Sequence, residues 1–282
     1  MRSLKTFKKE CVRRLALAQA VRKLNKYPRH PEARKHTLPA KLFVSLTSYP
    51  ARFGSLHLTV KSLLDQTVKP DQIILWLDEC ARDTLPLAVK QLQGDLFSVQ
   101  TCTDMRSFTK IVPALLRFPD AFIVTVDDDV YYPDHCLERL IKAFDPAEPT
   151  IVYHRGHRTR RSSDGSLAPY RTWDRRVDDR ASLLPSIDVF PTGVGGVLYP
   201  PGSLPSATTN ARLLTRLSPT CDDTWLYFMW RQTSWKAKRV PGPRPKLLEW
   251  PASQDQKSLK VFHRGGMKDQ HLKDMSDFFG VP

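Results

Sequence analysis

Three consecutive carboxylates, Asp127, Asp128 and Asp129, directly follow an apolar segment and are the residues of this sequence best suited to chemistry. The preceding segment, 121–126, is apolar apart from Thr125 and rich in β-branched residues, as expected of a strand covered on both faces. Adjacent carboxylates at the end of a buried strand repel one another and lose water, so without a cation at least one should become neutral. Because side chains alternate along a strand, Asp127 and Asp129 could share a hard divalent cation while Asp128 faces the other way.

A polar turn is the alternative interpretation of these three residues, since Asp is common in turns. A second acidic pair, Asp222 and Asp223, opens a predicted helix that continues in aromatic and apolar residues. An Asp at the start of a helix usually caps the free backbone N–H groups there, and this role accounts for one of the two acids. The other acid is a candidate for chemistry. His263 precedes a flexible Gly pair and is a further candidate ligand.

Composition limits the class of protein. The 282 residues are 41% hydrophobic and 26% charged, which is typical of a globular chain with one large domain or two small ones. A formal net charge of +15 favours polyanionic partners, among them nucleic acid, nucleotide diphosphates, phosphorylated glycolipids and anionic membranes. The five cysteines are far apart and include no Cys-x-x-Cys pair, which suits free thiols in a reducing cytoplasm.

Residues 1–38 form a basic N-terminal section, and the absence of a continuous apolar region there argues against a secretory signal. Apolar side chains fall near helical spacing in it, at Phe7, Cys11, Leu15, Ala18 and Val21. This pattern predicts a basic amphipathic helix that could lie on an anionic membrane surface or pack against the domain. The sequence thus indicates a cytoplasmic protein, in peripheral contact with the inner face of the cytoplasmic membrane if the helix binds lipid.

From residue 41 onward, short apolar segments alternate with segments of helical spacing. The predicted strands are 42–46, 73–77, 97–102 and 121–126, with predicted helices near 56–64, 85–92 and 108–116 between them. This alternation predicts an α/β fold with a mainly parallel sheet, whose ligands bind at the carboxyl ends of the strands. Polar residues follow those ends at 47–49, 78–79, 103–104 and 127–129, so we expect them along one edge of the sheet.

The second half of the chain is less regular. A helix is predicted over 133–144 and a strand over 150–154, after which 155–188 is basic and predicted to be a loop, either an acceptor-binding lid or a solvated insertion. Glycines at 193, 195 and 196 would allow the backbone to turn sharply or approach a ligand closely. This segment is not a phosphate-binding P-loop, because no Gly-Lys-Ser/Thr follows it.

Over residues 41–232 the sequence resembles the nucleotide-sugar-dependent glycosyltransferases of the GT-A fold, in particular bacterial family-2-like enzymes of surface polysaccharide and lipopolysaccharide synthesis. The resemblance rests on motifs that occur in the family's order: 44–52 (VSLTSYPAR), 62–66 (SLLDQ), Asp104 with Lys110, the three aspartates, the loop 192–201 and the acidic pair at 222–223 followed by Trp225. It implies a single catalytic domain, Rossmann-like, with a mainly parallel central sheet flanked by helices. Its expected parts are a nucleotide-binding half (39–132), an acceptor-binding half (133–262) and a C-terminal tail (263–282), preceded by the N-terminal extension.

The resemblance also implies roles for individual residues. Asp129 would bind Mn²⁺ or Mg²⁺ with support from Asp127. His263 would be a further metal ligand by analogy with the C-terminal metal-binding His of other GT-A branches, a less direct match. Donor-binding residues would be Thr47, Tyr49, Arg52, Asp78, Asp104, Lys110 and Asp128. Acceptor-binding residues would be Gly195, Gly196, Asp222 and Trp225. Asp223 matches the second acid of the family motif that supplies the catalytic base.

The implied reaction moves a sugar from a nucleotide-sugar donor to a glycan or lipid-linked acceptor. The donor expected first is a UDP-sugar. A carboxylate on the face of the sugar opposite the leaving group would remove the acceptor's proton, so one displacement would invert the anomeric centre. Two alternatives stay open. A metal-dependent phosphoesterase or nuclease would need further Asp, Glu or His ligands. A non-catalytic polyanion-binding module would explain the charge but not the acidic clusters, which repel phosphate, so we expect no nucleic acid partner.

Overall fold

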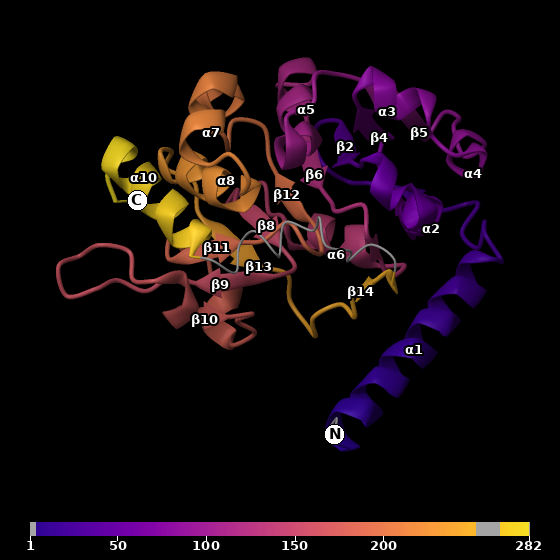
Figure 1. Ribbon diagram of the computed structural model, residues 1–282, viewed down its shortest axis with the longest axis horizontal. Helices are drawn as coiled ribbons and strands as arrows, with labels where there is room; N and C mark the ends of the chain where they lie inside the picture. Colours follow the sequence, from indigo (N-terminus) through magenta and orange to yellow (C-terminus); the bar gives the residue numbers. More distant parts are fainter. Residues whose placement is uncertain (1–3, 252–265, 282) are drawn as a thin grey trace.

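The protein is built around a seven-stranded sheet with helices on both faces, as the computed structural model shows for residues 4–251 and 266–281 (Figure 1). The strand order is β13-β8-β12-β6-β2-β4-β5. In chain order the strands are β2 (Leu42–Thr47), β4 (Gln72–Leu77), β5 (Phe97–Thr101), β6 (Phe122–Thr125), β8 (Ile151–Tyr153), β12 (Val197–Tyr199) and β13 (Ala237–Arg239). Only β12 runs antiparallel to its neighbours, so the predicted α/β fold with a mainly parallel sheet is confirmed.

Alternating side chains of the sheet face two separate hydrophobic layers. Leu42, Val44 and Leu46 pack on one side, together with residues of α2 (Phe53–Leu64), α3 (Glu79–Asp83), α4 (Leu87–Lys90) and α6 (Cys136–Ala143). Phe43 belongs to the other layer, with α5 (Val112–Arg117), α7 (Ala211–Leu217), α8 (Asp222–Arg231) and α10 (Met267–Phe279). The period of two in the strands thus places the parallel sheet between two apolar layers, as expected of βα units.

The prediction that 155–188 is a loop is wrong in part. β9 (Gly156–Arg158) and β10 (Asp174–Arg175) join β11 (Val189–Pro191) in an antiparallel sheet of order β10-β9-β11. Between them lie the short 3₁₀ turns η3 (Tyr170–Thr172) and, after β10, η4 (Arg180–Leu183). The strands are too short and too basic to show an alternating apolar pattern, and their pairing with distant β11 is what stabilises them.

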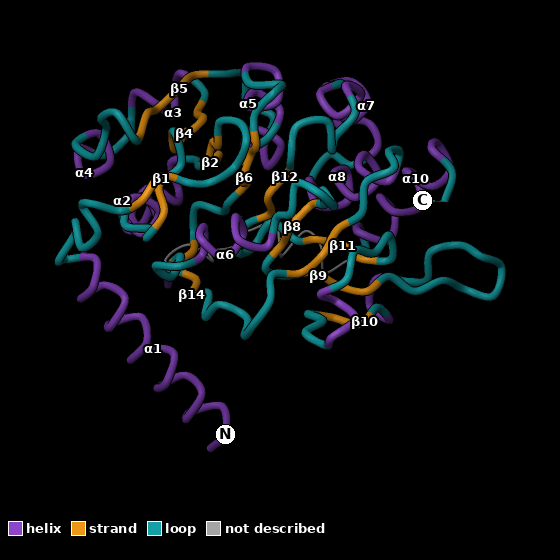
Figure 2. The backbone as a smooth tube through the Cα atoms, turned by 180° about the vertical axis from the view of Figure 1, so that it is seen from behind, coloured by secondary structure: helices purple, strands orange, loops and turns teal. Residues whose placement is uncertain are grey.

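The helix predicted at the N-terminus is α1 (Leu4–Leu24), which projects from the body in two opposite views (Figures 1 and 2). Its last turns pack through Leu17, Ala20 and Leu24 against Tyr131 and Trp250. Two short strand pairs lie nearby, β1 (Arg34–Lys35) with β3 (Val68–Lys69) and β14 (Leu248–Glu249) with β7 (Val130–Tyr131). Among the described residues, no helix combines the length and apolar character needed to cross a bilayer.

Three further 3₁₀ turns complete the described structure and connect strands to helices. They are η1 (Pro50–Arg52) after β2, η2 (Arg106–Lys110) before α5, and η5 (Ser206–Thr209) before α7. Two of them carry predicted site residues, since η1 ends at Arg52 and η2 ends at Lys110. Because parallel strands place their carboxyl ends at one edge, η1 and the residues after β6 come together there.

Candidate active site

Asp128 fastens the end of β2 to the end of β6. One of its carboxylate oxygens accepts a hydrogen bond of 2.6 Å from the Ser48 hydroxyl, and the other accepts one of 2.6 Å from the Arg52 guanidinium. Burial raises the pKa of Asp128, and the charge of Arg52 acts against that rise. A further hydrogen bond runs from the Thr59 hydroxyl to the Asp128 carbonyl, so α2 also holds this turn. Asp128 therefore shapes the strand ends rather than facing an open site.

Asp127 points instead toward Lys110, at the end of η2. The Lys110 ammonium lies 2.8 Å from an Asp127 carboxylate oxygen. Burial alone would raise the pKa of Asp127, but Lys110 more than offsets this effect, and the pKa is lowered. The Asp127 backbone N–H donates to the Tyr132 hydroxyl at 2.7 Å, which fixes the turn after β6. Asp127 is thus held as a carboxylate with a defined direction.

Lys110 connects the two acidic motifs of the sequence. Its ammonium also lies 2.8 Å from Asp222, the first residue of α8, which is more than a hundred residues away along the chain. Burial acts to lower the pKa of Lys110, yet Asp127, Asp222 and Asp223 raise it well above its ordinary value. Lys110 therefore remains a cation, placed between the acids that follow β6 and the acids that open α8.

Asp223, the predicted base, lies beside this group. Its carboxylate accepts a hydrogen bond of 2.9 Å from the backbone N–H of Gly193. A Cβ added at Gly193 would lie 2.9 Å from the Lys110 ammonium and 3.4 Å from carboxylate oxygens of both Asp127 and Asp223. Burial, followed by the neighbouring charge of Asp222, raises the pKa of Asp223 to about 6. A carboxyl group with this pKa can accept a proton near neutral pH.

Asp129 shows the electrostatic conflict that the sequence predicts for three adjacent acids. Burial and the charge of Asp127 raise the pKa of Asp129 to about 7, although Arg52 lies 3.4 Å from one of its oxygens. A divalent cation would relieve this conflict, and carboxylate oxygens are the donors that Mg²⁺ and Mn²⁺ prefer. The carboxylates of Asp127 and Asp129 therefore have the donor chemistry that a hard divalent cation requires.

Further metal ligands are not gathered in the described parts of the chain. Within 4–251 and 266–281, no group of three or more His, Cys, Asp or Glu side chains is placed to hold a metal ion. Two protein carboxylates are nevertheless a common complement for Mg²⁺ bound with substrate phosphates. The predicted ligand His263 lies outside the described residues.

The other predicted donor-binding residues lie along the same edge but are engaged in local structure. Asp78 caps α3 by accepting the backbone N–H of Ala81 at 2.9 Å, and Asp104 accepts the backbone N–H of Arg106 at 2.7 Å. The Thr47 hydroxyl donates to the Trp76 carbonyl at 2.9 Å. Tyr49 is exposed, with the Arg52 guanidinium 5.3 Å from its ring centroid. Tyr49 and Asp104 are thus the exposed residues of this group.

The structure places three predicted acceptor-binding residues inside the protein. Trp225 is completely buried and donates its indole N–H to the Thr208 carbonyl at 2.9 Å, so here it supports α8. Gly195 and Gly196 have positive φ angles of 103° and 98°, and an added Cβ at Gly195 would lie 2.8 Å from Leu247. These two glycines shape the turn before β12, whereas Gly193 is the glycine that contacts the acids.

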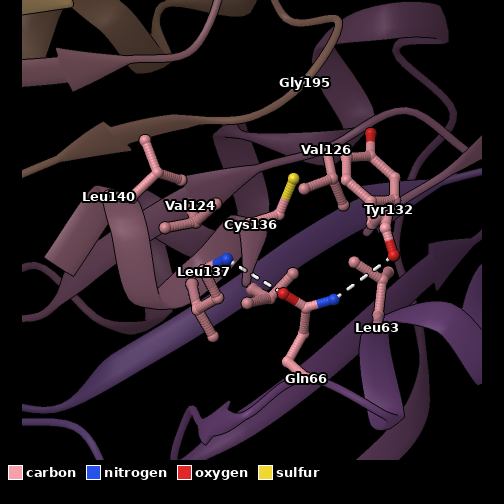
Figure 3. Close-up of a pocket in the computed structure, with 10 residues that line it drawn as sticks. Leu63, Gln66, Val124, Val126, Tyr132, Cys136, Leu137, Leu140 and Gly195 are labelled. Atoms are coloured by element: carbon pink, nitrogen blue, oxygen red, sulfur yellow. Dashed lines mark hydrogen bonds between the residues drawn. The ribbon is translucent and has the colours of Figure 1, made fainter. Parts of the chain in front are cut away.

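A cavity behind the carboxylates belongs to the core rather than to the site. It lies between α2, α6 and the sheet and is lined mainly by apolar side chains (Figure 3). The amide of Gln66 lines the cavity. It accepts a hydrogen bond from the Leu137 N–H at 2.9 Å and donates one to the Tyr132 carbonyl at 3.4 Å. Burial raises the pKa of the Cys136 thiol there to about 12, so it is unreactive. This cavity indicates no ligand.

Two cations and an aromatic ring near Asp223 were not predicted as site residues. Lys268, in the first turn of α10, lies 4.4 Å from the ring centroid of Tyr170. The charge of Lys268 affects the pKa of Asp223 and of Tyr170. Arg155, two residues after β8, is close enough to Asp223 for the carboxylate to affect its pKa. The basic character of 155–188 was visible in the sequence, but nothing there indicated that α10 returns to the site.

Comparison with known proteins addresses the same region of the chain. Residues 49–181 match the family model described as Glycosyl transferase family 2. The matched stretch includes Arg52, Lys110 and the three aspartates after β6, and it ends before the acidic pair of α8. Together with the observed strand order, the match supports the GT-A class of α/β fold and a transferase.

Several solved structures are similar to this chain at low sequence identity. A 4-diphosphocytidyl-2C-methyl-D-erythritol synthase from Anaerococcus prevotii is 13% identical, with 72% of this chain and 88% of that chain covered and a TM-score of 0.47. An inositol-1-phosphate CTP transferase from T. maritima is 14% identical, with 86% and 98% covered and a TM-score of 0.45. A mannosyltransferase from Pyrobaculum calidifontis, in complex with GDP-Man and Mn²⁺, is 14% identical, with 84% and 64% covered and a TM-score of 0.44. No curated protein matches the chain.

Proposed function

We propose that this protein is a metal-dependent, inverting glycosyltransferase that moves a sugar from a nucleotide-sugar donor to a hydroxyl of a glycan or lipid-linked acceptor. The observation that carries the proposal is the position of Lys110, at 2.8 Å from both Asp127 and Asp222. It brings the acids after β6, which suit a diphosphate with its metal, next to Asp223, which suits proton transfer. The family-2 match over 49–181 supports the same reaction class.

In the proposed reaction, the acceptor oxygen attacks C1 of the donor sugar while the C1–O bond to the diphosphate breaks. The electron pair of that bond leaves with the diphosphate, and the hydroxyl proton passes to the Asp223 carboxylate. Attack from the face opposite the leaving group inverts the anomeric centre. The Gly193 N–H orients Asp223 through its 2.9 Å hydrogen bond. Lys110 places a buried positive charge close to the leaving diphosphate.

Asp127 and Asp129 would hold Mn²⁺ or Mg²⁺, which when bound would stabilise the negative charge that develops on the diphosphate. Arg52 pairs with Asp128 and lies near Asp129, so it fixes the loop after β2 against these acids. The exposed ring of Tyr49 would stack on the base of the nucleotide. Asp78 and Asp104 would shape the rim of the donor site through their turns.

A direct test is nucleotide release measured across UDP-, GDP-, CMP- and TDP-sugars with Mn²⁺. We expect one nucleotide class, UDP first, to be released well above the rate without enzyme, and release to rise when the matching acceptor is added. Hydrolysis of phosphodiesters without sugar transfer would support the phosphoesterase alternative instead. Retention of nucleic acid in place of nucleotide-sugar binding would support the polyanion-binding module.

The N-terminal helix supports a location at the inner face of the cytoplasmic membrane, with α1 in peripheral contact with anionic lipid. Phe7 and Leu15 are 68% and 62% exposed, and Cys11 and Ala18 between and beyond them are exposed too. These residues recur every three or four positions, on the face opposite Leu17, Ala20 and Leu24, which are buried. An apolar stripe turned to solvent and flanked by exposed basic residues such as Lys8, Arg14 and Arg22 suits a lipid interface.

Replacing this stripe should weaken membrane binding. We expect the full-length Phe7→Ser/Leu15→Ser protein to sediment with vesicles containing anionic lipid at least several-fold less than the unchanged protein, because burial of each large apolar side chain contributes about 2 kcal/mol. A matched control is Leu87→Ser/Leu116→Ser, which removes two leucines that are equally exposed elsewhere, 67% and 66%. Equal sedimentation of the two double variants would assign α1 a different role.

A further inference from the structure

Two cations near the small antiparallel sheet, Arg155 and Lys268, interact with Asp223, and a third, Arg176, acts on Arg155. Arg155 lies between β8 and β9, Arg176 follows β10, and Lys268 comes from α10. Tyr170 lies among them, since its pKa responds, after burial, to both Lys268 and Asp223. The group therefore combines segments that are more than a hundred residues apart in the chain.

The guanidinium of Arg155 has a side-chain nitrogen without a hydrogen-bond partner in the described structure. Its Nε atom is shielded from solvent and has no hydrogen-bond partner in residues 4–251 and 266–281. In the same residues no carboxylate lies within ion-pair distance of its guanidinium. Burial and the nearby charge of Arg176 lower the pKa of Arg155. A partly buried guanidinium whose Nε has no partner is costly unless an anion binds it.

The backbone of Arg176 has a conformation that residues with a Cβ rarely adopt. Its φ angle is 55°, in the left-handed region, which costs about 1 kcal/mol for a residue with a Cβ. The Arg176 N–H donates a hydrogen bond of 3.0 Å to Nδ1 of His157. Burial lowers the pKa of His157 to about 3, so the ring stays neutral and remains an acceptor. The fold thus stabilises a strained residue whose side chain repels Arg155.

Lys268 completes the group through α10. Its ammonium lies 4.4 Å from the ring centroid of Tyr170 and 5.1 Å from that of Phe190. The Tyr170 backbone N–H donates to the Asp269 carboxylate at 2.6 Å, so α10 and the segment after β9 are fastened to each other. Burial acts to lower the pKa of Lys268, but neighbouring groups, including Asp223, raise it. Lys268 and Arg155 thus act on Asp223 from the segments that carry α10 and β9.

The position of the group indicates which substrate it would contact. β9, β10 and α10 lie at the opposite end of the molecule from β4 and β5, whose ends form the predicted donor side (Figure 1). The segment before β9, which carries Arg155, and the first turn of α10, which carries Lys268, therefore lie away from the predicted donor side. Asp127 also acts on the pKa of Arg155, so the donor diphosphate is the competing occupant.

We propose that Arg155, Arg176 and Lys268 bind an oxyanion carried by the acceptor, a phosphate ester or a carboxylate, and thereby place the acceptor hydroxyl at Asp223. The proposal rests on the proposed glycosyl transfer for the identity of the acceptor, but the anion site itself does not depend on it. Guanidinium forks match the planar pairs of oxygens in phosphate and carboxylate groups. Tyr170 would cover the site with its ring and keep Lys268 directed into it.

The site can be tested by calorimetric titration of the full-length protein with glycerol 3-phosphate and with glucuronate, using glycerol and glucose as the uncharged partners. We expect one of the two anions to bind and its uncharged partner not to bind. Arg155→Met should weaken that binding at least tenfold, the usual effect of losing a charge-assisted hydrogen bond. Arg180→Met removes an exposed arginine of the same basic region and should leave the affinity unchanged.

The identity of the anion that binds separates a phosphate ester from a carboxylate. Lys268→Met is a second variant in case Arg155→Met folds poorly, and thermal unfolding of each variant shows which proteins remain folded. Equal affinities in the Arg155, Lys268 and Arg180 variants, or no binding of either anion, would overturn the proposal. Competition between the anion and the nucleoside diphosphate would also overturn it, by assigning the cations to the donor. None of these outcomes bears on nucleotide release, so failure here and failure of the proposed transferase activity remain distinguishable.

Discussion

Asp223→Asn should reduce turnover by roughly two to four orders of magnitude, the usual contribution of general-base catalysis, while donor binding is retained. The amide keeps the size of the side chain, and its oxygen can still accept the Gly193 N–H, which is bonded at 2.9 Å in the unchanged protein. What the substitution removes is the ability to take up the acceptor's proton. The loss should therefore appear in kcat and not in the dissociation constant of the nucleotide sugar.

The matched variant is Asp222→Asn, one residue earlier on the same helix. Asp222 pairs with Lys110 at 2.8 Å, so its loss should disturb the diphosphate side and cost less turnover than the loss of Asp223. Donor affinity by calorimetry and turnover at saturating donor must be measured for both variants, because a poorly folded protein loses both quantities together. If Asp222→Asn has no measurable turnover while the turnover of Asp223→Asn is close to that of the unchanged protein, the assignment is reversed. Full activity in both would place the base elsewhere, and the next carboxylate to replace would be Asp188, which is exposed and directly precedes β11.

The pH dependence gives an independent check of the same assignment. Burial and Asp222 raise the pKa of Asp223 to about 6, and only the ionised carboxylate can accept a proton. Turnover should accordingly fall about tenfold per pH unit below pH 6 and become level above it. The slow residual reaction of Asp223→Asn should lack this acidic limb. An unchanged limb in that variant would assign the titration to another group.

Removal of the metal should abolish sugar transfer, and Asp129→Ala should lose most of its affinity for the nucleoside diphosphate. In the described structure the pKa of Asp129 is raised to about 7 by burial and by Asp127, so a cation at this position would relieve a large electrostatic conflict. EDTA should stop transfer completely, and added Mn²⁺ or Mg²⁺ should restore it. The measurement is nucleotide binding by calorimetry with and without Mn²⁺, alongside the transfer rate.

Asp120→Ala is the control for Asp129→Ala. Asp120 is exposed and precedes β6, whereas Asp129 follows it, so Asp120→Ala removes an equal charge near the same strand but leaves Asp127, Asp128 and Asp129 intact. We expect it to bind nucleotide and respond to EDTA as the unchanged protein does. Full transfer by Asp129→Ala in the presence of EDTA would contradict both the metal site and the GT-A mechanism.

The sequence by itself determined the layered α/β fold and the edge at which the acids lie. Apolar strand segments such as 73–77 and 121–126 carry enough β-branched residues to be recognised, and the helical spacing between them dictates parallel pairing. The positions of Ser48 and Asp128 follow from that topology, because their strands are neighbours and end together. Local pattern and strand direction are sufficient for features of this kind.

Only the tertiary structure decided which candidates meet. It brought Lys110 to Asp127 and Asp222 together, selected Gly193 over Gly195 as the partner of Asp223, and placed Trp225 in the core. The short strands β9 and β10, and the return of α10 to Tyr170, likewise have no local signal. The physical reason is that these contacts join segments far apart in sequence, and long-range packing and charge pairing, rather than local propensity, set their energies.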